Sequence, residues 1–129
     1  MLSIVRQLLQ AVSYLHCQKI AHRDIRLETV EVVASSELQP DDVRIQFKSL
    51  HKAVKLEAAE QRLFDDLDGL QFCAPEIFNK WTGHSLAVDE YAIGVLAFFL
   101  FSGMKDYPCK IPLSLTDDME IYEYIRSSQ

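Results

Sequence analysis

The stretch that most constrains the fold is the apolar run from Leu86 to Phe101. Its only charged residues are Asp89 and Glu90, so a helix formed here would carry apolar side chains on every face. Helices of this kind are buried in a protein core or against a partner. The apolar part is too short to span a bilayer, and Gly103 follows it as the expected C-cap. We therefore expect this helix to lie in the core or against partners.

Apolar residues also recur at helical spacing in Ser3–Cys17 and in Asp117–Ser127. Ser3 and Thr116 are the expected N-caps of these two helices. The run Lys55–Phe64 predicts a further short helix with its charged side chains in solvent. The inward-facing residues would be Ile4, Val5, Leu8, Leu9, Val12 and Leu15 in the first segment, Met119, Ile121, Tyr122 and Ile125 in the second, and Leu56, Leu63 and Phe64 in the third.

Two short β-branched runs, Val30–Val33 and Val43–Phe47, are separated by the polar stretch 34–42 and predict a β-hairpin. The chain has 129 residues, of which 49% are apolar and 25% charged, which is enough for one domain with one core. The sequence therefore predicts a mainly α fold with a small β-hairpin.

Four short motifs follow one another along the chain. They are His22-Arg23-Asp24, the V-x-I-x-F run Val43–Phe47, Ala74-Pro75-Glu76, and the segment from Asp89 to Gly94. In this order they resemble the eukaryotic protein kinase family, in its Ser/Thr rather than its Tyr form. The resemblance implies the large (C-terminal) lobe of the protein kinase fold, truncated, with the hairpin beside the catalytic loop. Residues 1–129 would be a partial kinase domain that lacks the small lobe and the last helices. A further, narrower similarity is to the calmodulin-dependent branch.

The resemblance assigns catalytic positions in the loop. Asp24 stands where kinases have the base that accepts the substrate hydroxyl proton. Arg26 replaces a Lys that stabilises the phosphoryl group, and its planar fork differs in shape from an ammonium. Thr29 and Gln46 replace the Asn and Asp that hold magnesium, a metal that prefers hard oxygen ligands such as carboxylates. We interpret Asp24 and Arg26 as vestigial, and Thr29 and Gln46 as degenerate cofactor-binding positions with no metal site.

Other matched residues would have structural roles. The resemblance implies that His22 and Phe47 belong to a stack of side chains linking the two lobes of a kinase. It also implies that Asp89 anchors the backbone of the catalytic loop, with Arg23 as further structural support. Glu31 falls where kinases place an apolar side chain under adenine, and a carboxylate is costly to bury there. A one-residue shift that turns Glu31 to solvent is the alternative.

The segment Lys48–Cys73 corresponds to the activation segment of kinases. In regulated kinases a phosphate there often pairs with the Arg of the H-R-D motif, here Arg23. Ser49 is the only hydroxyl residue in the segment, so this switch is not expected. Asp65–Asp68 is interpreted as a solvated acidic loop rather than a metal site. Gly69 stands near the position where many Ser/Thr kinases have a Thr that bonds the catalytic Asp.

Three functions remain open on this sequence. The first is a pseudokinase lobe that acts as a binding or scaffolding module, and it is motivated by Thr29, Gln46, Lys48 and Glu31. The second is a divergent active Ser/Thr kinase that transfers phosphate from ATP to protein hydroxyls. ATP and Mg²⁺ are expected as cofactors only in that case. The third is a truncated chain that cannot fold alone, because apolar helix faces would be exposed.

The expected partners are proteins, docked through the helix at 117–127 and the activation segment. The formal net charge of −6 argues against nucleic-acid or anionic membrane surfaces. Cys17, Cys73 and Cys109 are odd in number and too widely spaced for a disulfide framework, and no C-x₂-C or H-x₃-H pair indicates zinc. No signal peptide is visible, and we expect a cytoplasmic protein.

Overall fold

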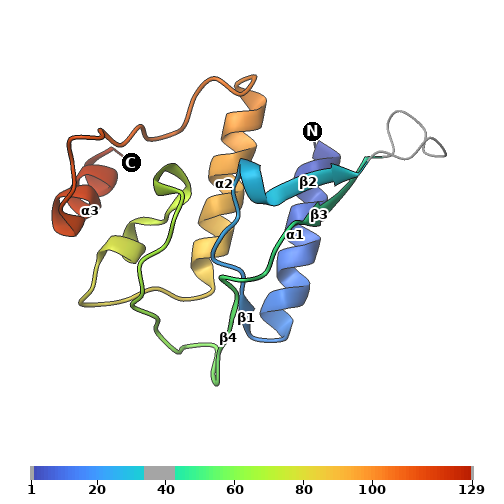
Figure 1. Cartoon of the computed structure of the whole chain (residues 1–129), viewed down its shortest axis with the longest axis horizontal. Coiled ribbons are helices and arrows are strands. Elements are labelled where there is room, and N and C mark those ends of the chain that lie inside the picture. The colour runs from blue at the N-terminus through green and yellow to red at the C-terminus, as the bar shows by residue number, and fades with distance from the viewer. Residues whose placement is uncertain (1, 34–42, 129) are drawn as a thin grey trace.

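A computed structural model describes residues 2–33 and 43–128 of the chain, and three α-helices and two small sheets account for its regular structure. The helices are α1 (Leu2–Cys17), α2 (Ala87–Phe101) and α3 (Asp118–Ser127). Figure 1 shows α2 standing between α1 and α3. The fold is mainly α, as the sequence predicts.

Helix α2 organises two hydrophobic clusters. On one side, Leu8 and Val12 of α1 belong to a buried cluster with Ile93 and Leu96 of α2. On the other, Ile121 of α3 belongs to a second buried cluster that also contains residues of the short helix η3 (Pro75–Phe78) and the first turn of α2. The helix is not buried all round, because Phe98 and Phe101 are 47% and 54% exposed. The expected central helix is therefore present, with one apolar side in solvent among the described residues.

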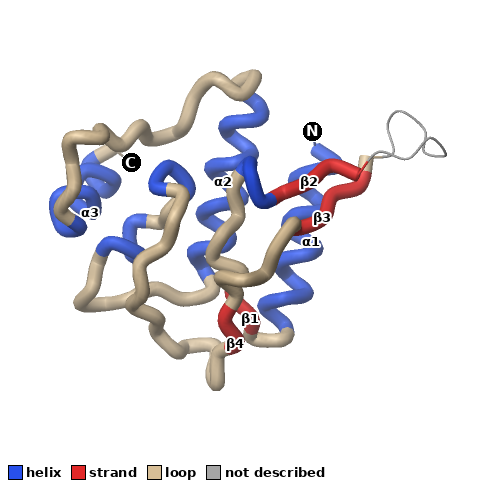
Figure 2. Tube along the Cα trace, in the orientation of Figure 1, coloured by secondary structure: helices blue, strands red, loops and turns tan. Residues whose placement is uncertain are grey.

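The two sheets are both two-stranded and antiparallel (Figure 2). Strands β2 (Val30–Val33) and β3 (Arg44–Phe47) pair as the sequence predicts, and their connection, 34–42, lies outside the described residues. Strands β1 (Ile20–Ala21) and β4 (Val54–Lys55) form a second, unforeseen ladder. The β1–β4 ladder joins the residues just before His22-Arg23-Asp24 to the segment Lys48–Cys73.

The prediction of a short helix at Lys55–Phe64 is wrong. Lys55 ends strand β4, and the backbone of the next residue, Leu56, donates to the carbonyl of Lys19 at 2.7 Å. Further on, Leu63 forms an isolated bridge with His84 through two 2.8 Å backbone hydrogen bonds. These distant partners use the backbone groups that a helix would need. Leu56 is buried as expected, whereas Phe64 is 51% exposed.

Both predicted caps are also wrong. Helix α1 already begins at Leu2, so Ser3 lies inside it and accepts a hydrogen bond from the Gln7 side chain at 3.1 Å. Helix α3 is capped by Asp117, whose carboxylate accepts from the backbone amides of Met119 and Glu120 at 3.0 and 3.2 Å. A carboxylate one residue further on took the role expected of Thr116 because its oxygen reaches the free amides of the first turn.

No helix in residues 2–33 and 43–128 combines the length and apolarity that crossing a bilayer requires.

Candidate catalytic loop and activation segment

The backbone of the His22-Arg23-Asp24 loop is held by one buried carboxylate of α2. Asp89 is 1% exposed, and it accepts hydrogen bonds from the backbone amides of His22 and Arg23, both at 2.8 Å. A third contact joins its Oδ2 to Nε2 of His16 at 2.9 Å, at the end of α1. Arg23 has a positive φ of 66°, a conformation that non-glycine residues adopt at some cost. The Asp89 carboxylate therefore connects both helices to the loop and holds it in a strained shape.

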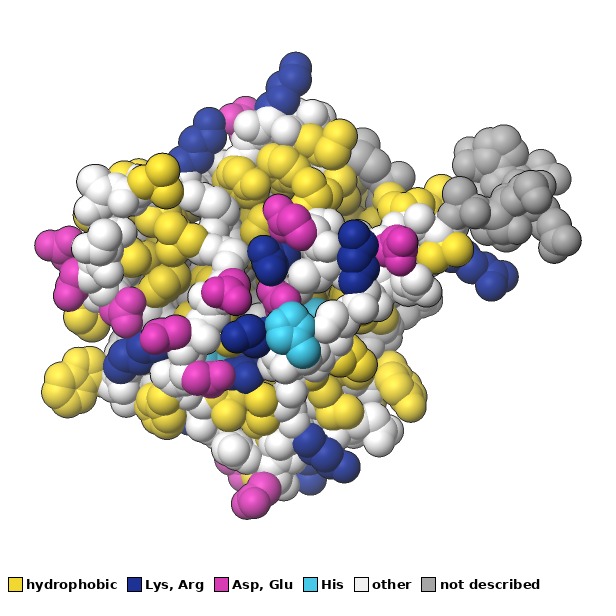
Figure 3. All heavy atoms as spheres, in the orientation of Figure 1, with side chains coloured by type: hydrophobic (Ala, Val, Ile, Leu, Met, Phe, Trp, Pro, Cys, Tyr) yellow, Lys and Arg dark blue, Asp and Glu magenta, His cyan; other side chains and the backbone are white. Residues whose placement is uncertain are grey.

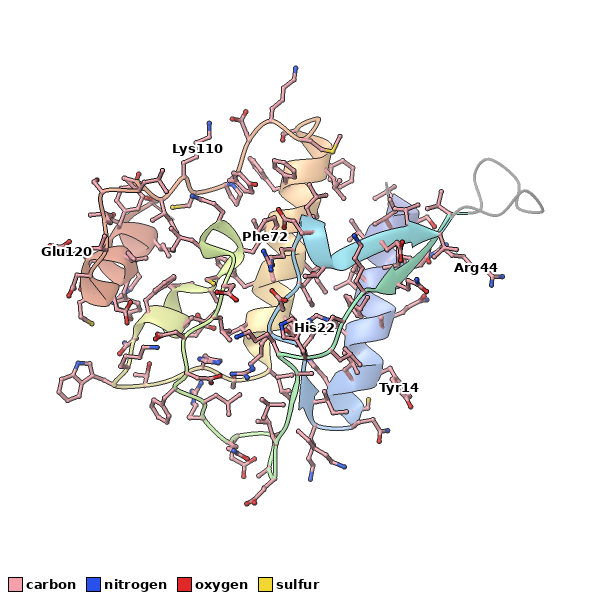
Figure 4. All side chains as sticks on the ribbon, viewed as in Figure 1. Tyr14, His22, Arg44, Phe72, Lys110 and Glu120 are labelled. Carbon is pink, nitrogen blue, oxygen red and sulfur yellow. The ribbon has the colours of Figure 1, made fainter. Side chains whose placement is uncertain are left out.

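His22 lies in the middle of the molecule, whereas Tyr14, Lys110 and Glu120 point outward (Figure 4). Its ring stacks at a tilt on Phe47 of β3, with ring centroids 4.3 Å apart. Its Nδ1 accepts the backbone amide of Asp24 at 3.1 Å, so the ring is neutral with its proton on Nε2. Burial lowers the pKa of His22, against the opposing charges of Asp89 and Asp24. His22 thus orders the loop as a neutral side chain.

Asp24 and Arg26 contact one another directly. The Arg26 Nε donates to Oδ1 of Asp24 at 2.8 Å, and Asp24 is only 7% exposed. This hydrogen bond is the main reason that the pKa of Arg26 is raised. The cavity that both residues line, together with Cys73, has a volume of about 10 Å³, which is room for about one water molecule. The base and the cation that the resemblance implies are therefore neighbours beside a small cavity.

Thr29 uses its hydroxyl within the loop itself. Its Oγ1 donates to the backbone carbonyl of Asp24 at 2.5 Å and accepts the amide of Arg26 at 3.1 Å. The residue ends the short helix η1 (Leu27–Thr29) and is 8% exposed. A hydroxyl engaged in this way closes the turn of the loop and is not directed toward a ligand.

Gln46 of β3 lies directly opposite Glu31 of β2. Its side-chain Nε2 donates to Oε2 of Glu31 at 2.8 Å, and both side chains are exposed among the described residues. Glu31 is therefore at the surface of the described part of the chain. The Gln46 side chain thus donates to a carboxylate through its nitrogen, and the oxygen that it could offer a cation is neutral.

The acidic run Asp65–Asp68 does not converge on one point. Asp65 pairs with Arg23 at 2.5 Å, Asp66 with Lys80 at 2.6 Å, and Asp68 with Lys52 at 3.9 Å. In the described part of the chain, no three acidic, His or Cys side chains gather as a metal site would require. Figure 3 shows acidic and basic side chains interleaved on the face in view. The acidic loop is thus a set of ion pairs with three separate elements.

His84, for which the sequence analysis assigned no role, enters the site, and Gly69 contributes by its backbone conformation. His84 is fully buried, and its Nε2 lies 3.4 Å from NH1 of Arg23, across 61 residues of chain. Gly69 has a φ of 75°, and a Cβ on it would meet Cδ of Arg26 at 2.8 Å. Of these two features, only the positive φ at position 69 could have been predicted locally, because glycine adopts that conformation readily.

The chain is similar to known proteins over most of its length. The family model described as "Protein kinase domain" matches residues 1–125. The probable serine/threonine-protein kinase PLK of Dictyostelium discoideum is 30% identical over 126 residues, which are 97% of this chain and 11% of that protein. The phosphorylase b kinase gamma catalytic chain, liver/testis isoform, of Mus musculus is 35% identical over 111 residues, covering 81% and 25%.

Death-associated protein kinase 2 of Homo sapiens is 32% identical over 106 residues, which are 81% of this chain and 27% of that protein. The chain thus spans between 11% and 27% of the length of these relatives.

Proposed function

Since this chain belongs to the protein kinase family, we propose that it is a catalytically impaired, kinase-like module that binds other proteins. The proposal includes the assignment of residues 1–129 to the large lobe of the fold, because the matched motifs run from the catalytic loop onward.

The observation that carries the proposal is the state of the two magnesium positions. The hydroxyl of Thr29 is bonded to loop backbone, and the amide of Gln46 is bonded to Glu31. Both groups are neutral, whereas magnesium sites in phosphoryl transfer rely on carboxylate oxygens. The residues present therefore do not fit a magnesium–nucleotide complex.

A divergent active kinase is the second candidate, and the contact between Asp24 and Arg26 favours it. A buried carboxylate next to a fixed guanidinium keeps a base and a cation together where a phosphoryl group would be transferred. General base catalysis contributes about 10²–10⁴ in rate, but this contribution needs a positioned phosphate. Because Thr29 and Gln46 are both neutral, the first candidate is better supported.

The proposed partners are proteins that dock on the activation segment and on α3. Helix α3 presents Met119, which is 41% exposed, beside Glu120 and Glu123. A shallow groove along this helix is lined by the same residues and by Tyr124. We place the protein in the cytoplasm as part of this proposal, a compartment in which the free thiols of Cys17, Cys73 and Cys109 stay reduced.

The test is a thermal melt of the protein with ATP, with and without magnesium. A ligand at about 100 times its dissociation constant stabilises a fold by about 2.7 kcal/mol, which moves a melting temperature visibly. We expect no magnesium-dependent shift. A shift that is present in the natural protein and absent in Gln46→Ala would overturn the proposal, because Gln46 would then be a working ligand. Gln46 is exposed, so the variant should fold.

A further inference from the structure

The outer edge of strand β3 is bonded by a side chain of α1, which runs alongside it (Figure 1). The Nε2 of Gln7 donates to the carbonyl of Val43 at 2.5 Å, and its Oε1 accepts the backbone amide of Ile45 at 3.1 Å. The same Nε2 donates to Oγ of Ser3 at 3.1 Å, one turn earlier in the helix. Both ends of one side-chain amide therefore hold the strand, across 36 and 38 residues of chain.

The backbone groups that Gln7 bonds are those that point away from β2. In an antiparallel ladder, alternate residues bond to the partner strand, and the residues between them direct their N–H and C=O groups to the opposite edge. The amide of Lys48 donates to the carbonyl of Thr29 at 2.9 Å and continues the β2–β3 ladder, which leaves Val43 and Ile45 directed outward. Gln7 thus supplies the donor and the acceptor that the next strand of a sheet would supply.

The register of β3 decides which side chains enter the candidate site. In the present register Gln46 lies opposite Glu31, and Phe47 stacks on His22. Because side chains alternate between the two faces of a strand, a shift of one residue would turn every side chain of β3 to the other face. Such a shift would remove Phe47 from His22 and Gln46 from Glu31.

Apolar packing alone specifies this register less sharply than Gln7 does. Ile45 and Phe47 pack against the buried cluster shared by α1 and α2. Hydrophobic contacts of this kind are non-directional, whereas a hydrogen bond restricts both the distance and the angle between particular atoms. The two bonds of Gln7 select the carbonyl of Val43 and the amide of Ile45 individually, so they distinguish the present register from its neighbours.

We propose that Gln7 is a positioning residue of the candidate site, whose side-chain amide stands in for a neighbouring strand and fixes β3 in the register that places Gln46 and Phe47. The inference goes beyond the proposed function, because it applies whether or not the module transfers phosphate. Its test involves no nucleotide and no partner, so it can fail while the proposed function stands, and the reverse.

The experiment is NMR spectroscopy on the protein and three variants. Gln7→Met keeps a long unbranched side chain of similar helix propensity and removes both hydrogen bonds to β3. Gln7→Glu keeps an oxygen acceptor for Ile45 but, as a carboxylate, has no donor for Val43. Gln10→Met is the matched control, because it makes the same substitution at an exposed residue of the same helix.

Three signals are measured in each variant. The first is hydrogen exchange of the Ile45 amide, relative to that of the Leu96 amide in α2, which reports on global unfolding. The second is the nuclear Overhauser contact between the Hα atoms of Val32 and Ile45, which are opposite one another in the present register. The third is the same kind of contact between the rings of His22 and Phe47.

We expect Gln7→Met to speed exchange of the Ile45 amide by about tenfold or more, because its acceptor is lost, while exchange of Leu96 is unchanged. Both Overhauser contacts should fall to about half their natural intensity or less. In Gln7→Glu, exchange of Ile45 should be slower than in Gln7→Met, because one acceptor remains. Gln10→Met should match the natural protein in all three signals.

Four results would overturn the proposal. One is equal exchange of Ile45 in Gln7→Met and Gln10→Met, and another is exchange of Ile45 in Gln7→Glu as fast as in Gln7→Met, since either would show that the side chain of Gln7 does not hold this amide. The third is faster exchange of Ile45 with both Overhauser contacts unchanged, because Gln7 would then shield the edge without setting the register. The fourth is an equal acceleration of Leu96, because Gln7 would then support the whole fold.

Discussion

The carboxylate of Asp89 lies 2.8 Å from the backbone nitrogen of Arg23, a residue that holds a φ of 66°. Left-handed backbone at a non-glycine residue costs about 1–2 kcal/mol, so something must hold it. Asp89 supplies acceptors to Arg23 and also to the preceding amide, of His22. The shape of the catalytic loop therefore depends on a residue of α2, 66 positions away.

Replacing Asp89 with Asn should lower the free energy of unfolding by about 2–4 kcal/mol. An amide retains one oxygen but turns an NH₂ group toward a second buried donor, which is left without an acceptor. The measurement is urea denaturation. The matched control is Glu90→Gln, whose side chain is 69% exposed and whose effect should stay within about 0.5 kcal/mol. A similar decrease in the free energy of unfolding in both variants would mean that the buried contacts of Asp89 do not stabilise the fold.

Gly69 and Gly103 provide a second comparison, because both have a φ of 75° but differ in surroundings. A Cβ at Gly103 meets no atom within 4 Å, so Gly103→Ala should cost about 1 kcal/mol from backbone strain alone. A Cβ at Gly69 would displace Arg26 from Asp24, so Gly69→Ala should cost about 1 kcal/mol more. Thermal melts of both variants give the difference. Equal costs would show that Arg26 moves aside freely.

The stability of the protein should fall as the pH falls from 6.5 toward 4. Burial, with the adjacent charge of Arg23, lowers the pKa of His84 from 6.5 to about 4. The unfolded chain then takes up a proton at His84 over this range while the folded chain does not. Stability from the neutral ring is complete above pH 6.5 and is lost progressively below it, to a total of about 3 kcal/mol at pH 4.

Denaturation at several pH values checks this, with His84→Gln as the test variant and the exposed His51→Gln as the control. The slope between pH 6.5 and 4 should become shallower in His84→Gln and stay as in the natural protein in His51→Gln. The buried His22 contributes in the same direction, so some slope should remain. An unchanged slope in His84→Gln would contradict the assignment.

Sequence patterns predicted the parts of this fold that depend on local periodicity. The helices around Leu8 and Ile93 follow from apolar spacing, and the β2–β3 hairpin follows from two β-branched runs. The same spacing failed at Lys55–Phe64, because backbone pairing with Lys19 and His84 outweighs local helical preference there. Propensity is a weak prior where tertiary contacts compete with it.

In the candidate site, too, sequence patterns predicted the positions of residues but not their contacts. The positions of Asp24, Arg26, Thr29 and Gln46 could be assigned from motif spacing, but not what each one bonds to. The pair between Arg23 and Asp65 crosses 42 residues, and the contact of Arg23 with His84 crosses 61. No local pattern in the sequence encodes contacts over such distances, so they emerge only when the β1–β4 ladder and the Leu63–His84 bridge bring the segments together.

The opposed pair of Glu31 and Gln46 leads to a prediction about metal binding. Gln46→Asp would place two carboxylates directly across the β2–β3 ladder, where the natural side chains share a 2.8 Å hydrogen bond. Like charges directly opposite one another destabilise a strand pair by up to about 1 kcal/mol, so without metal the melting temperature should fall by about 2–5 °C. Millimolar magnesium should restore the melting temperature, because two carboxylates offer a pair of hard anionic oxygen ligands where the natural pair has one carboxylate and one amide.

Gln46→Ala is the control and should show no response to magnesium. If Gln46→Asp melts like Gln46→Ala with and without magnesium, residues 31 and 46 do not face each other in solution, and the natural hydrogen bond between Gln46 and Glu31 does not form there either.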